Sequence, residues 1–458
     1  MSRKLRRRKL IQSIGAAGVI GLAGCATGGD GGGDGGDGGD GGDSGDSGDG
    51  GGATGTPSEG DDGMEEGDDE MEDSGSSEPI PMGSILPITG SLEAYGSGMQ
   101  AAVDLAVQHV NDAGGPLDRQ IEVNHTDSET RPEAGVNRFQ TLVAENNIIG
   151  FVGAASSGVS TAIAEQVGGE QVMEVSNAST SPVLAELGYG DSDDTKYFAR
   201  TSPNDGQQGI IMGRVLDNYI EAESAAFLYV DNPYGEGLAD KASEAFSGET
   251  LNMVGYGQDQ ADYTSTLDQV FQGNPDGVGF VGYPGNGTTI MRQWNQGGYG
   301  GEWVLSEGVN SPDDFFEPLS DIVEGMYVAS PQPEETEGQS RFTEAMGEQN
   351  TLFAPHAYDA MFLMALAMER AGEASGTAMA KNIRAVSRSP GETVTVNDFD
   401  KAKQLLADGN EINYEGASSP VNMNEALEPL NRFGILQVEN AQTKTLETIE
   451  RSFFEGKL

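Results

Sequence analysis

From Pro79 onward, short runs of apolar residues alternate with longer segments in which apolar residues recur at helical spacing. The apolar runs predict strands at residues 80–87, 121–123, 148–153, 225–230, 277–282 and 303–305. The helical spacing predicts helices at residues 98–107, 133–145, 158–167 and 353–372. Strands that alternate with helices in this way are typical of parallel sheets flanked by helices. The fold class expected for residues 79–458 is therefore α/β.

The first 25 residues have the pattern of an export signal. Basic residues fill most of residues 3–9, and a weakly apolar stretch follows at residues 10–24. This stretch is too short to cross a bilayer, which needs roughly 20 residues, so it indicates a signal peptide. The run from Arg7 to Ile11 resembles a twin-arginine signal. The run Leu22-Ala23-Gly24-Cys25 resembles a lipobox, which would make Cys25 the lipidated first residue of a protein anchored on the extracellular face of the cytoplasmic membrane.

Residues 26–78 are dominated by Gly-Gly-Asp and Ser-Gly-Asp repeats and an acidic run. Residues 28–78 contain 18 acidic residues and no basic residue. A segment with so few apolar side chains cannot bury enough surface to offset the entropy lost on ordering. We expect residues 26–78 to be a disordered, self-repelling tether between the anchor and the folded part.

The chain is strongly acidic, with a formal net charge of −49. Residues 79–458 hold 56 acidic and 19 basic residues, a net charge of −37 in the part that must fold. Such repulsion is screened in molar salt, where the Debye length is only about 3 Å. The composition resembles proteins of extreme halophiles, with an ordinary acidic protein as the alternative. An acidic surface repels phosphate, so no nucleic-acid partner is expected.

Cysteine and histidine usage argues against a metal site. Cys25 is the single cysteine, which excludes an intramolecular disulfide and a multi-cysteine zinc cluster. The three histidines, His109, His125 and His356, show no metal-ligand spacing. Ser156, Asp231 and His356 can be written as a catalytic triad, but the chain has no Gly-x-Ser-x-Gly elbow and no phosphate-loop lysine motif. We expect no metal, no cofactor and no enzymatic activity.

Four polar loops follow predicted strands, where parallel sheets usually bind ligands. They span residues 154–158, 176–182, 231–237 and 306–308, the second after a strand-like run at residues 172–175. Hydroxyls and free N–H groups at the start of a helix suit a carboxylate, so Ser156 and Ser157 are candidates. A plain N-cap serine is the alternative for the first loop, and a surface position is the alternative for Tyr234 in the third.

The order and spacing of these loops resemble the branched-chain amino acid binding proteins, the leucine/isoleucine/valine-binding type with the type I periplasmic-binding-protein fold. The resemblance covers residues 80–440. It implies two lobes, each a parallel sheet flanked by helices, joined by a three-strand hinge. Lobe I would be residues 79–201 and 332–416, and lobe II residues 202–331 and 417–458. The crossovers are expected near residues 200–204, 330–333 and 416–421, which are rich in Pro, Gly or Ser.

On the first lobe, the resemblance implies that Ser156 and Ser157 bind the α-carboxylate of a ligand. The Ala178 backbone and the Thr180 hydroxyl fall where the family holds the carboxylate and the ammonium group. Here the loop reads Ser-Asn-Ala-Ser-Thr, which departs from a Pro-Ala-Ala-Thr-like run.

On the second lobe, Tyr234 and Tyr283 match the two aromatic positions of the family's site. Glu307 matches the acid that takes the α-ammonium, a role that suits the need of a buried ammonium for a charged partner. Tyr95 falls near the family's side-chain pocket, with a core or rim position as the alternative.

The resemblance implies a monomeric, extracellular solute-binding lipoprotein that passes a branched-chain or related amino acid to the permease and ATPase subunits of an ABC importer. Closure of the two lobes over the solute would drive capture. No residue identifies the ligand side chain. Relatives of this kind also bind urea, short amides, or aromatic and aliphatic acids, and a solute sensor that signals to a membrane receptor is a further alternative.

Overall fold

The computed structural model describes residues 78–191 and 193–457. The predicted export signal, Cys25 and the predicted tether as far as residue 77 lie outside the described residues. Among the helices of the described part, none combines the length and the apolar character needed to cross a membrane.

The first sheet of the described chain has five parallel strands in the order β2-β1-β3-β4-β5. Its strands are β1 (Ile80–Leu86), β2 (Ile121–Asp127), β3 (Gly150–Gly153), β4 (Met173–Ser176) and β5 (Phe198–Arg200). The first four confirm predicted strands. β5 is three residues long and was not predicted from the sequence.

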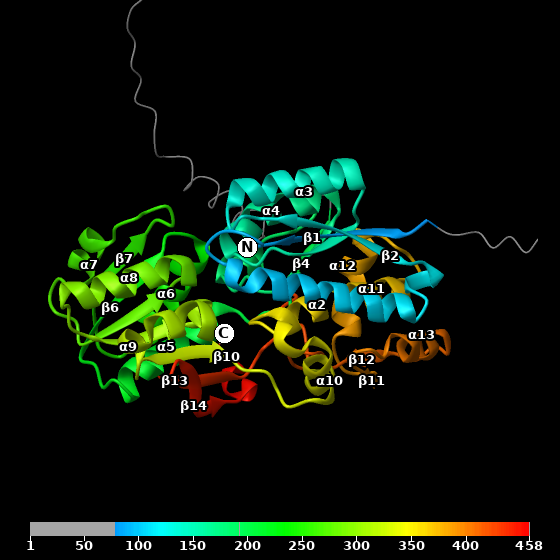
Figure 1. The fold of residues 1–458 in the computed structure, drawn as a ribbon. Coiled ribbons are helices and arrows are strands. Elements are labelled where there is room, and N and C mark those ends of the chain that lie inside the picture. The colour runs from blue at the N-terminus through cyan, green and yellow to red at the C-terminus, as the bar shows by residue number, and fades with distance from the viewer. Residues whose placement is uncertain (1–77, 192, 458) are drawn as a thin grey trace, which may run out of the picture. The chain divides into compact units, whose positions relative to one another are not determined.

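Helices cover both faces of the first sheet (Figure 1). On one face, α3 (Pro132–Asn146) packs against α4 (Ser157–Glu170). The other face carries three helices that pack together: α2 (Glu93–Asp112), α11 (Ala354–Ala371) and α12 (Gly376–Val386). Proline stands in the first turn of α3 and of α11, where its missing N–H costs nothing. The predicted helices on this sheet are confirmed.

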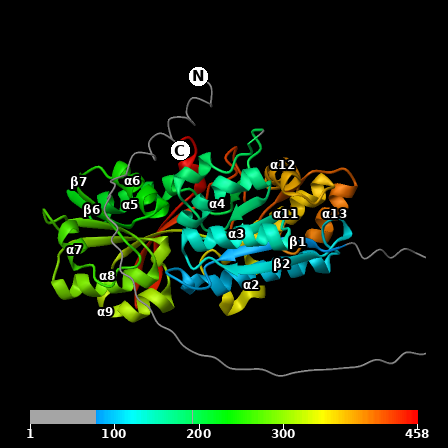
Figure 2. The ribbon, with the colours of Figure 1, turned by 90° about the horizontal axis from the view of Figure 1, so that it is seen from above.

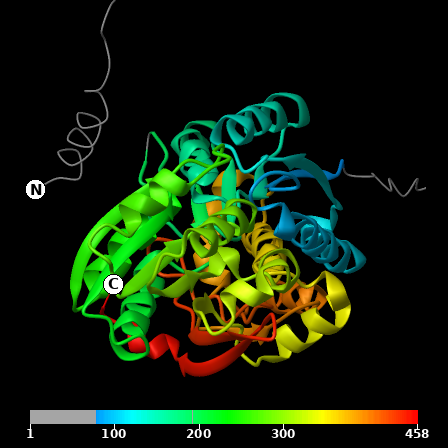
Figure 3. The same cartoon turned by 60° about the vertical axis from the view of Figure 1, so that its left-hand side comes forward.

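The second sheet of the described chain has the order β14-β13-β10-β9-β8-β6-β7. Its strands are β6 (Ser224–Val230), β7 (Glu249–Tyr256), β8 (Gly277–Val281), β9 (Glu302–Ser306), β10 (Tyr327–Pro331), β13 (Phe433–Glu439) and β14 (Gln442–Ile449). The five neighbouring strands β10, β9, β8, β6 and β7 run parallel. β13 is antiparallel to β10 and to β14. β13 and β14, red in Figure 3, therefore add an antiparallel edge to an otherwise parallel sheet. The sequence pattern did not indicate this edge.

The second sheet is flanked by α5 (Asp205–Asn218), α6 (Pro233–Ala245), α7 (Thr264–Val270), α8 (Pro284–Gly297) and α9 (Ser320–Val323). α5 and α6 pack closely because α5 presents glycines at the contact. A Cβ added at Gly209 would lie 2.5 Å from the Lys241 Cβ, and one at Gly213 would lie 2.8 Å from the Ala245 Cβ. This close packing holds the first turns of both helices beside the same end of the sheet.

The remaining elements are short or lie outside the two main sheets. α10 (Glu337–Met346) and α13 (Phe399–Ala407) accompany a two-stranded parallel sheet of β11 (Glu392–Val394) and β12 (Ile412–Tyr414). One π-helical turn spans Pro312–Phe316. The short 3-10 helices are η1 (Pro116–Asp118), η2 (Pro182–Glu186), η3 (Glu307–Val309), η5 (Glu317–Leu319), η6 (Gly347–Gln349) and η7 (Arg451–Phe454).

The chain passes between the elements of the first sheet and those of the second at three places in the described residues (Figure 2). It does so at residues 201–204 between β5 and α5, at residues 332–336 after β10, and at residues 415–432 between β12 and β13. These segments lie at or beside the regions from which crossovers were expected. The division into lobes at residues 201/202, 331/332 and 416/417 stays a prediction.

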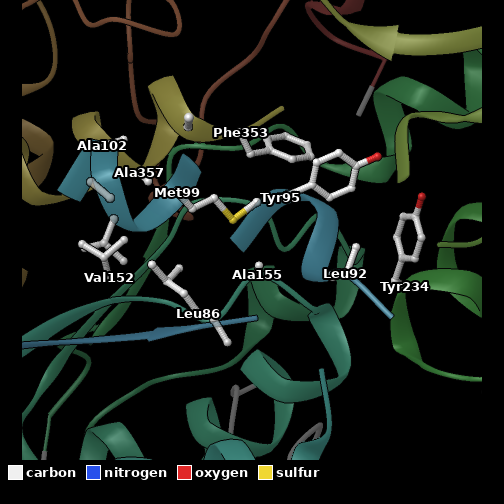
Figure 4. Packing of buried hydrophobic residues seen from close by; sticks show 14 of the residues in the cluster. Leu86, Leu92, Tyr95, Met99, Ala102, Val152, Ala155, Tyr234, Phe353 and Ala357 are labelled. Carbon is white, nitrogen blue, oxygen red and sulfur yellow. The ribbon is translucent and has the colours of Figure 1, made fainter. Parts of the chain in front are cut away.

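The core of the first sheet extends into the region between the two sheets. Leu86 of β1, Met99 of α2 and Val152 of β3 are fully or almost fully buried and pack together (Figure 4). The same cluster continues to Tyr95 on α2 and to Phe353, the residue before α11. The apolar packing therefore reaches the place where the carboxyl-end loops of both sheets meet.

Candidate ligand-binding site

The first loop follows β3 and leads into α4. Ser156 stands at the N-cap position, but its side chain makes no capping hydrogen bond. Its Oγ instead lies 3.3 Å from the Tyr283 hydroxyl. The Ser157 Oγ accepts hydrogen bonds from the backbone N–H groups of Thr180, at 3.1 Å, and Ser181, at 3.2 Å. Ser156 therefore occupies the N-cap position without capping the helix through its side chain, and the Ser157 hydroxyl hydrogen remains available to a ligand anion.

The second loop follows β4 and is held against the first. Ala178 is partly exposed to the space between the sheets, whereas Thr180 is 1% exposed. The Thr180 carbonyl accepts a hydrogen bond of 2.9 Å from the Asp205 N–H at the start of α5. The Thr180 Oγ1 is buried beside the Asp205 carboxyl, which its hydroxyl stabilises in the charged form. The oxygen accepts no hydrogen bond from the described residues, so it is suited to receive a ligand donor.

Two tyrosines of the second sheet's loops stack on one another. Tyr234, in the first turn of α6, and Tyr283, the residue before α8, lie with ring centroids 5.5 Å apart and planes 8° from parallel. Asn232, the N-cap of α6, donates a hydrogen bond of 3.2 Å to the Tyr283 hydroxyl. Both rings are 3% exposed, so the surface position considered for Tyr234 is wrong.

Glu307 begins η3 directly after β9 and is 2% exposed. Its Oε2 accepts a hydrogen bond from the Gln208 side-chain amide and lies 3.0 Å from the Tyr234 hydroxyl. Among the described residues, no lysine, arginine or histidine forms an ion pair with Glu307. Burial raises the pKa of the Glu307 carboxyl to about 7, although these hydrogen bonds lower it.

Tyr95 of α2 reaches across to the second sheet's loops. Its hydroxyl donates a hydrogen bond of 3.1 Å to the Gly308 carbonyl, and the side chain is 3% exposed. Two further hydrogen bonds join segments next to the first sheet to segments next to the second, from the Ser91 Oγ to Asn286 at 3.2 Å and from the Ser181 Oγ to the Pro233 carbonyl at 2.7 Å. Figure 4 shows Tyr95 beside Phe353, with Tyr234 facing them from the second sheet's side.

These side chains surround a tight pocket with about 330 Å³ of empty space, a figure that includes space open to solvent. Six of the eight predicted residues line it, namely Tyr95, Ser157, Ala178, Tyr234, Tyr283 and Glu307. Ser156 and Thr180 lie one hydrogen bond behind the lining. Lining residues not predicted from the sequence are Leu92, Met99, Ala155, Gly308, Leu352 and Phe353. These are mostly apolar and have no local pattern that separates them from the core.

A larger hollow of about 1,660 Å³ lies at the other ends of the second sheet's strands. It is open to solvent, and its lining includes the residues just before β6, β8 and β9, among them Glu223 and Asp276. In parallel sheets, ligands bind at the carboxyl ends of strands, so the smaller pocket is the better candidate.

The three residues that can be written as a triad do not come together in the structure. No group of three His, Cys, Asp or Glu side chains in the described residues could hold a metal ion. His356 is buried with both ring nitrogens lacking a hydrogen-bond partner, and Asp231 is exposed. Ser156, Asp231 and His356 therefore do not form a triad.

Comparison with known proteins places the chain in a family. A model described as periplasmic binding protein matches residues 79–409. The chemotactic signal transduction system substrate-binding protein BasB of Halobacterium salinarum is 34% identical over 383 residues, covering 82% of this chain and 91% of BasB.

Two solved structures have the same fold. The leucine binding protein LivK of Thermotoga maritima aligns with a TM-score of 0.69 at 20% identity, covering 82% of this chain and 99% of LivK. LivJ of Streptococcus pneumoniae, a branched-chain amino acid transporter substrate binding protein solved with isoleucine, aligns with a TM-score of 0.67 at 20% identity, covering 81% of this chain and all of LivJ. The chain therefore belongs to the periplasmic binding protein family and has the type I fold of these two structures.

Proposed function

We propose that this protein captures a branched-chain or related amino acid between its two lobes and delivers it to the permease of an ABC importer. The observation that carries the proposal is Glu307, a buried carboxylate without a cationic partner among the described residues. It lies opposite a loop pair whose hydroxyls and N–H groups suit an anion. A zwitterionic amino acid would supply the ammonium to one side and the carboxylate to the other.

The proposed roles follow this polarity. Ser156, Ser157 and the N–H groups at the start of α4 take the α-carboxylate. The Ala178 carbonyl, the Thr180 hydroxyl and Glu307 take the α-ammonium.

The remaining lining residues enclose the ligand side chain. Tyr234 and Tyr283 close over the ligand from the second lobe. Tyr95, Met99 and Phe353 form the apolar wall for the ligand side chain. This chain hydrolyses nothing itself, and ATP is used by partner subunits.

A thermal-shift screen tests the proposal. The protein is melted with each of the twenty amino acids, urea, short amides, and aromatic and aliphatic acids, and the screen is repeated with Glu307→Ala. Ligand at about 100 times Kd adds roughly 2.7 kcal/mol of stability. We expect an aliphatic amino acid to raise the melting temperature of the wild type and not of Glu307→Ala. A response only to compounds without an amine, unchanged in the variant, would overturn the assignment of Glu307 and the substrate class.

A second candidate function is solute sensing for a membrane receptor. It is favoured by the 34% identity with BasB, which is named as a chemotaxis protein. The two functions are separated by deleting the gene and measuring two responses to the ligand found in the screen. Loss of uptake with normal chemotaxis supports transport, and loss of chemotaxis with normal uptake supports sensing.

The location is also a proposal. Export by the twin-arginine route, lipidation at Cys25 and a tether of residues 26–78 would hold the protein on the extracellular face of the cytoplasmic membrane. Mass spectrometry of the N-terminal peptide of the native protein tests the modification of Cys25. Adaptation to molar salt predicts that the melting temperature rises steeply between about 0.1 M and 1 M salt, since the Debye length falls from about 10 Å to about 3 Å.

A further inference from the structure

A buried acid stands directly behind the first ligand loop. Glu174 lies in β4, is fully buried, and pairs in register with Phe151 of β3. Its Oε1 accepts a hydrogen bond of 3.3 Å from the N–H of Ala154, the residue that follows β3. The two candidate serines of the loop, Ser156 and Ser157, come two and three residues later. The Glu174 carboxyl is therefore bonded to the backbone unit from which the first loop starts.

Three serine hydroxyls surround the same backbone unit. The Ala154 carbonyl lies 2.6 Å from the Ser176 Oγ, 2.9 Å from the Ser179 Oγ and 3.1 Å from the Ser160 Oγ, and each hydroxyl is placed to donate to it. Ser176 and Ser179 belong to the second loop and Ser160 belongs to α4, and all three are fully buried. The starts of the two ligand loops are therefore joined at Ala154.

Glu174 completes this network on its inner side. The Ala154 N–H is shared between the Glu174 Oε1 and the Ser160 Oγ, at 3.3 and 3.1 Å. Ser160 is itself hydrogen-bonded to the Glu174 carboxyl, and its Oγ lies 2.9 Å from the Ser179 Oγ. A buried polar network whose members are all bonded holds them in one arrangement, whereas a partly bonded one does not. Removal of Glu174 should therefore loosen Ala154 without touching the pocket wall.

Glu174 has no charged partner. Among the described residues, no lysine, arginine or histidine forms an ion pair with it. Burial raises the pKa of Glu174 well above its usual range, although the hydrogen bonds from Ser160 and Ala154 lower it. The protonated acid provides one acceptor oxygen and one O–H donor. It also places no negative charge behind the loop that is proposed to take the ligand's carboxylate.

We propose that Glu174 is a positioning residue for the carboxylate side of the site, and that it holds Ala154 so that the serines of the first loop receive the ligand's α-carboxylate. This inference rests on the proposed function. Glu174 does not line the pocket, so it acts through Ala154 and Ser160. A positioning role affects only ligands that carry the carboxylate, whereas a merely structural role affects every ligand of the pocket.

Isothermal titration calorimetry on the whole protein tests this with L-leucine and L-leucinamide, which keeps the amine and the side chain but has an amide in place of the carboxylate. Glu174→Gln keeps an acceptor and a donor in the same place, and should bind leucine within about threefold of the wild type. Glu174→Met has neither and should bind leucine about tenfold more weakly, the size of one lost hydrogen bond. Its affinity for leucinamide should change by less than about threefold, since that ligand lacks the group that the loop receives.

The matched control is Glu165, which is exposed on α4. Glu165→Gln and Glu165→Met remove the same charge from the same region, and both should bind leucine as the wild type does. Ser160→Ala breaks the link from the side of α4, and its loss should be less than additive with that of Glu174→Met. If Glu174→Met does not fold, Ser160→Ala provides the same comparison of leucine with leucinamide.

Three results overturn the inference while leaving the proposed function standing. The first is wild-type affinity for leucine in Glu174→Met. The second is an equal loss of affinity for leucine and leucinamide, and the third is the same loss in Glu174→Gln as in Glu174→Met. If leucinamide binds the wild type too weakly to measure, the difference between the Gln and Met variants on leucine decides. If no amino acid binds the wild type, the proposed function fails, and the inference fails with it.

Discussion

Arg200 and Glu428 form a buried ion pair that joins the first crossing between the sheets to the third. The Arg200 Nε donates to the Glu428 Oε2 at 3.0 Å, and the two side chains are 1% and 10% exposed. Asn204 donates to the other carboxylate oxygen of Glu428 at 3.1 Å. The Arg200 guanidinium also donates hydrogen bonds to the carbonyls of Ser179 and Ser181 in the second loop. Through these hydrogen bonds, the ion pair links the second ligand loop to the first and third crossing segments.

Removing one partner of this pair should be strongly destabilising. Glu428→Gln leaves the Arg200 charge buried without a counter-charge, a change that typically costs about 3–5 kcal/mol. The measurement is urea unfolding at neutral pH. The matched control is Glu447→Gln, because Glu447 pairs with Arg214 at 2.7 Å with both side chains about one third exposed. The control should cost no more than about 1 kcal/mol, and equal losses in the two variants would contradict the role of burial.

Glu307 should lower the stability of the ligand-free protein at high pH. Burial raises the pKa of the Glu307 carboxyl from 4.5 to about 7. Between pH 4.5 and pH 7 the folded state therefore keeps a proton that the unfolded state has released. Stability therefore falls as the pH rises from about 4.5 to about 7. Glu307→Gln removes this loss, and we expect it to be more stable than the wild type by roughly 3 kcal/mol at pH 8 and little changed at pH 4.

Urea unfolding at both pH values checks this prediction, with Glu302→Gln, at the exposed start of β9, as the control. The stabilised variant should have lost its response to amino acids. A pH-independent difference between Glu307→Gln and the wild type would show that the titration of Glu307 is not its cause.

Asp359 of α11 fixes the start of the third crossing segment. Its carboxylate accepts hydrogen bonds from the Tyr414 hydroxyl at 2.7 Å, from the N–H groups of Ala417 and Ser418 at 2.7 and 2.9 Å, and from the Ser418 hydroxyl at 2.6 Å. A Cβ at Gly416 would lie 2.4 Å from the Asp359 Oδ2. Asp359→Ala should therefore cost more than about 3 kcal/mol, since several buried donors lose their acceptor.

Gly416→Ala gives an independent test of the same contact. It should also destabilise the protein, because the methyl group displaces the carboxylate. Gly409→Ala is not a suitable control, since Gly409 has φ of +79°. Gly300→Ala is suitable, since nothing lies within 4 Å of its added Cβ and its φ is not in the left-handed region. Thermal unfolding of both glycine variants should show a loss for Gly416→Ala alone.

The sequence predicted the parallel part of the fold and the four loops for local reasons. The four strands that lead into these loops are short apolar runs followed at once by small or polar residues, which is the local sign of a carboxyl-end loop. β7 and β14 were not predicted because most of their residues are partly buried or exposed, and their apolar positions are broken by polar ones. β13 is mostly buried, but its apolar run is short and was not predicted as a strand. Their pairing depends on the rest of the sheet.

The site was predicted where its residues follow strands, and missed where tertiary packing supplies them. Phe353 and Met99 line the pocket from helices whose apolar stripes otherwise indicate core. Gln208, which donates to Glu307, lies in a polar run after Asn204 that has the pattern of an ordinary helix start, with an N-cap and an acidic first turn. Only its complete burial separates it from solvent-exposed helix-start residues.

Ser156 and Ser157 are neighbours in sequence, but their substitution should have different effects. The Ser157 Oγ accepts two backbone N–H groups, and Ser157→Ala leaves both buried without a partner, at about 1–3 kcal/mol each. Ser156→Ala removes only a 3.3 Å contact with the Tyr283 hydroxyl, which keeps Asn232 as a partner. We expect a stability loss of about 2 kcal/mol or more for Ser157→Ala and within about 1 kcal/mol for Ser156→Ala.

Ligand binding should separate the two serines further. Ser156 lies at the contact between the loops of the two sheets, so its loss should weaken the amino acid complex while leaving the ligand-free melting temperature nearly unchanged. Tyr283→Phe removes the other side of the same contact and should reproduce the binding defect of Ser156→Ala. The losses in the double variant should be less than additive, because both changes remove the same hydrogen bond in addition to each side chain's own contact with the ligand. Fully additive losses in calorimetric titrations would mean that the hydrogen bond between Ser156 and Tyr283 does not contribute to binding.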